Sequence, residues 1–216
     1  MWTDSSTYVS ELTRALRLLD LQAVERLSQL LHGTYLRHRT VFFVGNGGSA
    51  STASHLATDF SKLTTRPGQA RLRCMALVDS VAALTAAGND LAYEEVFVEQ
   101  LRTFMEAGDV VVGISTSGRS RNILRAVEYA NQRGAITFGI TGADGGPLRA
   151  MTADSLSIPS LSVQQIEDLT TVAGHIACLA TREKCLTADP SIEIDGVGAR
   201  GTAETSVVAV NMNPAA

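Results

Sequence analysis

The sequence predicts an α/β fold: a doubly wound, parallel, five-stranded sheet with helices on both faces. Three observations indicate this fold. Short apolar runs of strand length alternate with helical patterns, small-residue turns follow two of those runs, and 216 residues are enough to bury a full core as one domain. In such folds ligands bind beyond the carboxyl ends of the strands, so the two turns mark the expected site.

Composition limits the class of partner. The net charge is -4 and no block of Lys or Arg is present, which argues against nucleic acid as the main partner. The three cysteines, Cys74, Cys178 and Cys185, lack metal-ligand spacing, so we expect a reduced compartment. The first residues lack a signal peptide's apolar core, and no apolar run reaches membrane-spanning length. We therefore expect a cytoplasmic protein with no membrane partner.

One long helix is predicted near the N-terminus, over about Ser5 to His32. Apolar residues recur there at alternating spacings of four and three, at Leu12, Leu16, Leu19, Ala23, Leu27 and Leu30. Such a narrow seam favours packing against copies of the same helix, which would make the protein an oligomer. The alternative is an ordinary helix packed on its own sheet.

The segment from Val41 to Asp59 is expected to be a strand, a glycine turn and a helix. The apolar run breaks into Gly45, Asn46, Gly47, Gly48 and Ser49 before a helical pattern begins. Small residues let the backbone approach an anion, and free N–H groups at the helix start point toward it, so we predict a phosphate site. His55 and Asp59 share one helix face and form a candidate acid/base pair or metal-ligand pair.

The rest of the chain repeats the alternation. A second strand over about Leu72 to Val78 ends at Asp79, and short helical patterns flank Gly88, Asn89 and Asp90. The further expected strands are Val110 to Ile114, Ala135 to Ile140 and a weak one near Leu156 to Ile158, and the expected helices are Tyr93 to Met105, Asn122 to Gln132 and Val163 to Lys184. A loop is expected around Gly145, Gly146 and Pro147, and a loosely ordered tail over 187–216, with Val207 to Val210 as an apolar island.

A second turn, Ser115 to Ser120, is rich in hydroxyl groups and precedes a helix. Four hydroxyls at a helix N-terminus can bind three phosphate oxygens without a lysine, which fits a phosphomonoester. The alternative is that these residues only cap the helix, although one cap uses one hydroxyl. Gly45, Gly47 and Ala50 also match a dinucleotide pattern, with Asp79 as a ribose-binding acid, so a nucleotide-cofactor oxidoreductase is a weaker alternative.

The last predicted helix carries a polar cluster beside its apolar face. Glu167, Thr171 and His175 fall on one side of it. A solvated face is the simple interpretation, but His175 together with His55 and Asp59 would make a functional group. Glu167 and His175 are eight residues apart, about 12 Å along a straight helix. One metal ion therefore reaches both only if their side chains converge, the helix bends near Gly174 or subunits share the site.

Five ordered blocks carry a family resemblance: VGNGGSAS, GNDLAYEEVF, GDVVVGISTSGRS, ITGADGG and a last helix with His175. Together they resemble the sugar isomerase (SIS) domain, most like its phosphoheptose isomerase group, over about residues 1–186. The resemblance implies a flavodoxin-like fold and a homotetramer held by N-terminal helices, with active sites between subunits. It also implies conversion of sedoheptulose 7-phosphate into D-glycero-D-manno-heptose 7-phosphate, with one zinc ion per subunit.

The resemblance also implies roles for individual residues. Asp59, His175 and Glu167 would be catalytic, and His55, Asp59, Glu167 and His175 would be zinc ligands. The substrate would be bound by Asn46, Gly47, Gly48, Ser49, Asp79, Asn89, Asp90, Ser115, Thr116, Ser117 and Ser120.

Three positions depart from the family pattern. The family has Glu where Asp59 stands, Gln where Glu167 stands and a second histidine where Thr170 stands. Asp for Glu withdraws the carboxylate by about 1.5 Å, and Glu for Gln adds a negative charge beside any metal. Glu167 could take over as the base. Two further functions stay open: an isomerase for another phosphosugar, and a non-catalytic tetramer like the SIS protein that binds the bacterial replication initiator.

Overall fold

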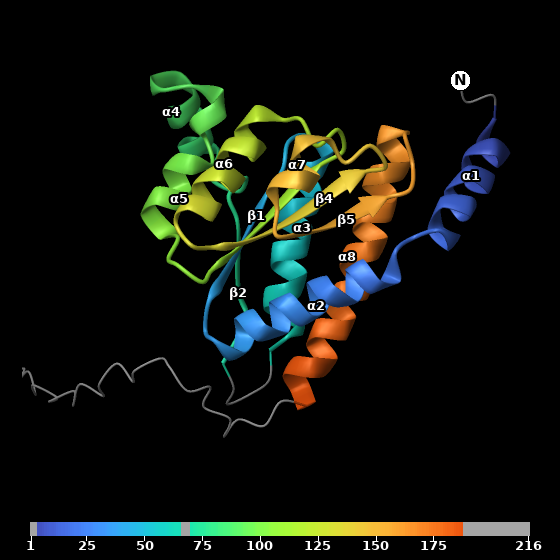
Figure 1. Cartoon of the computed structure of the whole chain (residues 1–216), viewed down its shortest axis with the longest axis horizontal. Helices are drawn as coiled ribbons and strands as arrows, with labels where there is room; N and C mark the ends of the chain where they lie inside the picture. Colours follow the sequence, from blue (N-terminus) through green and yellow to red (C-terminus); the bar gives the residue numbers. More distant parts are fainter. Residues whose placement is uncertain (1–3, 66–69, 188–216) are drawn as a thin grey trace, which may run out of the picture.

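A five-stranded parallel sheet forms the centre of the computed structural model, which describes residues 4–65 and 70–187 (Figure 1). The strand order is β2-β1-β3-β4-β5, and every neighbouring pair is parallel. The strands are β1 (Thr40–Val44), β2 (Arg73–Ala76), β3 (Val110–Ser115), β4 (Ile136–Gly142) and β5 (Asp154–Ile158). The predicted fold class and all five predicted strands are confirmed.

Helices cover both faces of the sheet, because alternate strand residues enter two separate cores. Phe43 and Val112 pack in the core between one face of the sheet and three helices, α2 (Leu21–Leu36), α3 (Gly48–Leu63) and α8 (Val163–Thr187). Phe42 and Val111 enter the opposite core. The helical elements on that face are α4 (Val81–Asp90), the short 3-10 helix η1 (Tyr93–Glu95), α5 (Val98–Phe104), α6 (Arg121–Gln132) and α7 (Gly146–Met151).

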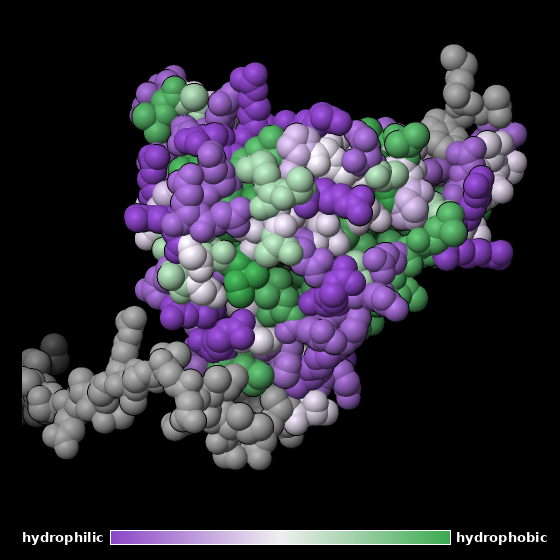
Figure 2. All heavy atoms as spheres, viewed as in Figure 1, coloured by the Kyte–Doolittle hydropathy of each residue, from purple (hydrophilic) through white to green (hydrophobic). Residues whose placement is uncertain are grey.

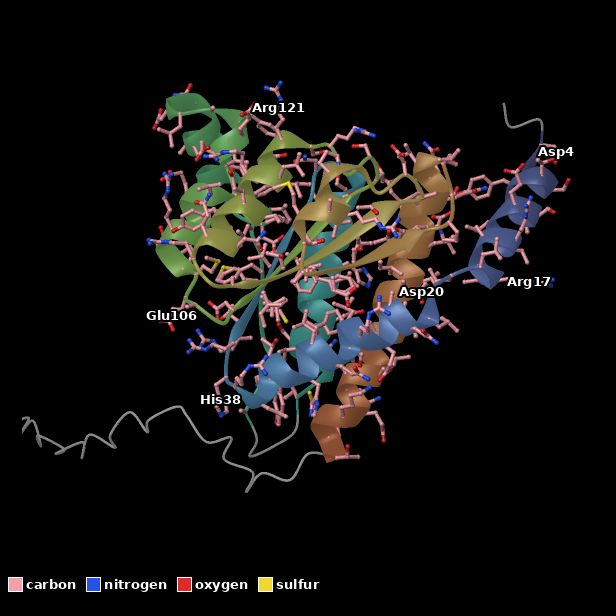
Figure 3. The ribbon with its side chains drawn as sticks, in the orientation of Figure 1. Asp4, Arg17, Asp20, His38, Glu106 and Arg121 are labelled. Carbon is pink, nitrogen blue, oxygen red and sulfur yellow. The ribbon has the colours of Figure 1, made fainter. Side chains whose placement is uncertain are left out.

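The prediction of one long N-terminal helix is wrong. The segment forms α1 (Ser5–Arg17) and α2, which are separated between Arg17 and Asp20 (Figure 3). Asp20 starts the second helix, because its side chain accepts hydrogen bonds from the backbone N–H groups of Gln22 and Ala23. The apolar seam is therefore divided. Leu19 and Leu27 are buried within the chain, whereas Leu16 stays exposed on α1, which projects away from the body (Figure 1).

Three smaller expectations also differ from the structure. The helix expected over Tyr93 to Met105 is divided into η1 and α5. The second strand, β2, is shorter than expected. The loop expected around Pro147 contains α7, and proline fits the first turn of this helix because a backbone N–H there would have no partner within the helix. The tail expected over 187–216 lies, apart from Thr187, outside the described residues.

An ion pair fastens α2 to the edge strand β5. Arg26 Nε lies 2.7 Å from Asp154 Oδ2, and this hydrogen bond lowers the pKa of Asp154 below its ordinary value of 3.8. A lowered folded-state pKa means that the pair stabilises the fold above pH 3.8, and that this contribution is lost as the pH falls through the folded-state value. Both side chains are partly exposed, which limits the gain through solvent screening.

We expect Asp154→Asn to lower the free energy of unfolding by at most about 1 kcal/mol at pH 7. The difference from the unmodified chain should shrink as the pH is lowered below 3.8, because protonation then removes the same charge. Urea unfolding of both proteins across this range checks the expectation. A difference that stays constant with pH would contradict the electrostatic explanation.

Among the helices of residues 4–65 and 70–187, none combines the length and apolar character needed to cross a membrane. All three cysteines are free thiols.

Candidate active site

The two predicted turns lie next to each other at the carboxyl edge of the sheet. The first follows β1 and the second follows β3, and these strands are hydrogen-bonded neighbours. The chain order reverses between them, since β2 lies on one side of β1 and the later strands lie on the other. This topological switch point is where ligands bind in doubly wound folds.

The first turn leaves the N-terminus of α3 without a side-chain cap. Gly47 is the N-cap residue with φ 55°, a conformation that favours glycine. Gly45 is required for a different reason: a Cβ atom there would collide with the backbone of Ser49. Ser49 is buried in the first turn of the helix. The turn therefore presents free backbone N–H groups to an anion.

The second turn leaves the N-terminus of α6 in the same state. Ser120 is its N-cap residue and forms no side-chain capping bond. The Ser120 hydroxyl instead lies 3.2 Å from that of buried Ser115, while Ser117 accepts a bond from the Arg119 backbone N–H. Gly118, at φ 62°, packs against the backbone of Gly145. Capping of α6 therefore does not account for the hydroxyls of Ser115 and Ser120.

Two asparagines connect the turns, and sequence analysis missed one of them. Asn46 donates to Asn122 Oδ1 at 2.9 Å, and Asn122 donates back to Asn46 Oδ1 at 2.8 Å. The Tyr93 hydroxyl also donates to Asn46 Oδ1 at 3.0 Å. Asn122 is almost fully buried at the start of α6. Asn122 Oδ1 also accepts from the Ile123 backbone N–H at 3.1 Å. These bonds satisfy the buried amide and fix the separation of the two turns.

His55, Asp59 and His175 form one cluster between α3 and α8. The Nε2 atoms of the two histidines are 2.9 Å apart, and Asp59 Oδ2 lies 3.2 Å from His55 Nε2 and 3.5 Å from His175 Nε2. Bond lengths of about 2.0–2.1 Å in a tetrahedral zinc site place neighbouring ligand atoms about 3.3 Å apart. The observed separations lie on both sides of that value. The three donors therefore fit a metal ion that keeps a fourth position open.

A glycine on α8 permits this cluster. Gly174 precedes His175 and packs directly against Leu56 of α3, so that a Cβ atom on Gly174 would overlap the leucine side chain. The close approach of the two helices brings together histidines that are 120 residues apart in the sequence.

Glu167 lies apart from the three clustered side chains. Its carboxylate packs against Gly48 at the N-terminus of α3, where a Cβ atom would collide with it. A negative charge is favourable at a helix N-terminus. Among the described residues, the group able to share one metal ion consists of His55, Asp59 and His175. Thr170, one of the three positions where the sequence departs from the expected pattern, is buried.

The other predicted substrate-binding residues do not all lie in the two turns. Thr116 lies in the second turn, where its carbonyl accepts a bond from the Gly142 backbone N–H. Asp79 follows β2 and lines a cavity beside that strand. Asn89 donates to Asp90 at 2.7 Å, and both are exposed in the last turn of α4.

Two uncapped helix N-termini at a switch point, with a metal-capable cluster between α3 and α8, are the features of an α/β domain that binds a small phosphorylated ligand. The family model of the SIS domain matches residues 6–142, and the chain belongs to the SIS domain family.

Its relatives include several phosphoheptose isomerases. The chain is 36% identical to phosphoheptose isomerase from Aneurinibacillus thermoaerophilus over 165 residues, which cover 76% of this chain and 82% of the relative. It is 38% identical over 152 residues to phosphoheptose isomerase 2 from Campylobacter jejuni, covering 69% and 74%. The solved structure of phosphoheptose isomerase from Neisseria gonorrhoeae matches with a TM-score of 0.76 at 31% identity, covering 82% of this chain and 96% of that one.

Proposed function

We propose that this protein is a phosphoheptose isomerase, an aldose-ketose isomerase that converts sedoheptulose 7-phosphate into D-glycero-D-manno-heptose 7-phosphate. One observation carries the proposal: helix α3 begins at the first uncapped turn and carries His55 and Asp59, which meet His175 of α8. His55 is the seventh residue after Gly48, about 10 Å further along the helix axis. An extended seven-carbon chain, from its phosphorus to C1, spans about 10 Å as well. The phosphate of one substrate can therefore lie at the start of α3 while its reacting carbons reach the cluster at His55.

Isomerisation requires a proton to move between two neighbouring carbons. Asp59 removes a proton from C1 of the ketose, and the electron pair forms the C1–C2 double bond of an enediol while the carbonyl oxygen gains a proton from His175. The proton held by Asp59 then returns to C2, and the C1 oxygen becomes the aldehyde as its proton leaves to His175. Asp59 Oδ2 and His175 Nε2 face the shared metal position, so we assign proton abstraction to Asp59 Oδ1 and proton exchange to His175 Nδ1. Ser49, Ser115 and Ser120 hold the phosphate and orient the sugar.

We assign the cluster to a zinc ion held by His55, Asp59 and His175, because three close N and O donors with an open fourth position are typical of catalytic zinc sites. Zinc would polarise the substrate carbonyl and stabilise negative charge on the oxygen. We expect chelator treatment to reduce turnover of sedoheptulose 7-phosphate at least about 100-fold, and added zinc to restore it. Full activity in a chelated protein that metal analysis shows to be metal-free would contradict the zinc assignment.

Glu167 is proposed to tune phosphate binding, since its charge lies at the helix start where the phosphate would sit. We expect Glu167→Gln to lower KM about fivefold, because removing one nearby negative charge favours an anion by about 1 kcal/mol, and to leave kcat nearly unchanged. Steady-state kinetics of both proteins check this. A loss of kcat of about 100-fold would instead assign the base to Glu167.

We further propose that residues 1–186 form a single SIS domain that assembles as a homotetramer through α1. Three leucines near the α1–α2 junction support this, because Leu16, Leu18 and Leu21 are exposed by 44%, 62% and 61%. Figure 2 shows apolar atoms on the surface at this junction. Sedimentation of the native protein tests the assembly, and Leu18→Glu should shift it toward smaller species.

The main experiment is a coupled assay of sedoheptulose 7-phosphate turnover, with a replication-initiator pull-down beside it. Turnover without capture supports the isomerase, whereas capture without turnover would favour the non-catalytic binding protein. Thermal shift with NAD and with a phosphosugar tests the oxidoreductase alternative, because only a ligand of the native state raises the melting temperature.

A further inference from the structure

The outer edge of the sheet next to β2 is open in the part of the chain that the structure describes. Within the described residues, β2 pairs only with β1, so its other side has no ladder partner. Arg73 and Met75 of this strand are exposed. A cavity of about 840 Å³ runs along the edge, lined by Cys74 and Met75 of β2, Thr58 and Ser61 of α3, and Phe104 of α5. An open edge of this kind can accept another strand.

The cavity has helices on both sides, which restricts what can fill it. Residues of α3 line it from one face of the sheet, whereas Gln100 and Phe104 of α5 line it from the other. A strand placed there would be covered on both faces. Such strands are continuously apolar and rich in β-branched residues, rather than alternating with polar residues.

This chain contains such a segment outside the described residues. Val207, Val208, Ala209 and Val210 are four consecutive apolar residues, three of them β-branched. The run has the same length as β2, which spans four residues. The proposed active site does not include it.

The place where the described chain ends suits this segment. Helix α8 ends at Thr187, and two of its thiols, Cys178 and Cys185, lie near Cys74 of β2. Burial raises the pKa of Cys74 to about 12, and the nearby thiols of Cys178 and Cys185 add to the shift. Residues 188–206 connect Thr187 to the apolar run. Nineteen residues can span roughly 60 Å, so the connection does not limit where the run binds.

Charge also favours binding of this part of the chain at the cavity. The cavity lining includes two cations, Lys62 and Arg71, against one acid, Asp79. Within the described residues neither cation forms an ion pair. The connecting segment is acidic, because it carries Asp189, Glu193, Asp195 and Glu204 against the single cation Arg200. Opposite charges would hold the connection near the rim of the cavity.

We propose that residues 207–210 of this chain bind in the cavity and add to the open side of β2 as a sixth strand. The backbone groups of the added run pair with the free edge of β2, and its valines fill the space between α3 and α5. The segment thereby covers an edge that could otherwise pair with another molecule.

Cysteine cross-linking tests the proposal in the full chain, since native Cys74 lines the cavity. Each of residues 207–210 is replaced by cysteine in turn, and mild oxidation is followed by peptide mass spectrometry. Alternate side chains of a strand point to opposite faces. We therefore expect an intrachain disulfide to Cys74 from two alternate positions, either 207 and 209 or 208 and 210, and little from the other two. Thr202→Cys and Cys74→Ala are the controls.

Cross-links that are absent, or equal at all four positions, would overturn the proposal. A disulfide between isotopically labelled and unlabelled chains would assign the edge to a second copy instead. Hydrogen exchange gives a second measurement that needs no cysteine. Deleting residues 188–216 should speed exchange of the outward-facing amides of β2 about tenfold or more, and unchanged exchange would contradict the added strand.

Discussion

Asp59→Asn should reduce the turnover of sedoheptulose 7-phosphate by about 100- to 10,000-fold, the contribution typical of a positioned general base. An amide cannot accept the proton from C1, and it is also a poorer ligand for the zinc ion proposed between His55 and His175. The fold should persist, because Asp59 is partly exposed and its partners in the structure are those two histidines. Steady-state kinetics with circular dichroism of the variant check both expectations.

Asp59→Glu is the matched control for charge and reach. It keeps the carboxylate and advances it by about 1.5 Å. We expect turnover within about tenfold of the unmodified chain, since a shift of about 1 Å changes rates by up to ~100-fold. If Asp59→Asn and Asp59→Glu were equally active, Asp59 could not be the base.

Gly174→Ala should weaken both the fold and the active site. The added methyl overlaps Leu56 of α3, and overpacking of this kind costs about 1–3 kcal/mol of stability. Because His175 is the next residue, pushing α8 away from α3 also separates the two histidines. We expect a loss of turnover of about 100-fold and weaker zinc binding. Thermal unfolding, kinetics and zinc titration measure the three effects.

Gly33→Ala provides the matched helical control. A methyl there meets only the end of the flexible Arg37 side chain, so stability should be unchanged or higher by about 1 kcal/mol. Combining Gly174→Ala with Leu56→Ala removes the overlapping atoms, and the double variant should be more stable than the sum of the two single effects predicts. Additive effects would mean that Gly174 and Leu56 do not determine the helix spacing.

Much of the fold could be predicted from local patterns. Apolar runs such as Val110 to Ile114 mark the strands, because a strand buried on both faces has no polar positions. The break after Arg17 was missed because the leucine spacing continues across it, and one capping aspartate, Asp20, decided the outcome. Helix α7 could not be predicted from local patterns, because it begins with glycine and proline, which are typical of turns as well as of helix starts.

The candidate site was only partly visible in the sequence. The two turns and the pair His55 and Asp59 could be found because each is local. Placing His175 beside them required the packing of α8 on α3. Asn122 was missed because its partner, Asn46, is 76 residues away. The eight-residue spacing indicated only the conditions under which Glu167 and His175 could share one metal ion. Nothing local indicated that Glu167 meets Gly48.

The most direct test of the account is proton NMR of the purified, zinc-supplemented chain with sedoheptulose 7-phosphate in D2O. Proton transfer through an enediol predicts an aldoheptose 7-phosphate that carries deuterium at C2, because a proton held by Asp59 exchanges with solvent. A folded protein with zinc bound that forms no aldose would contradict the account.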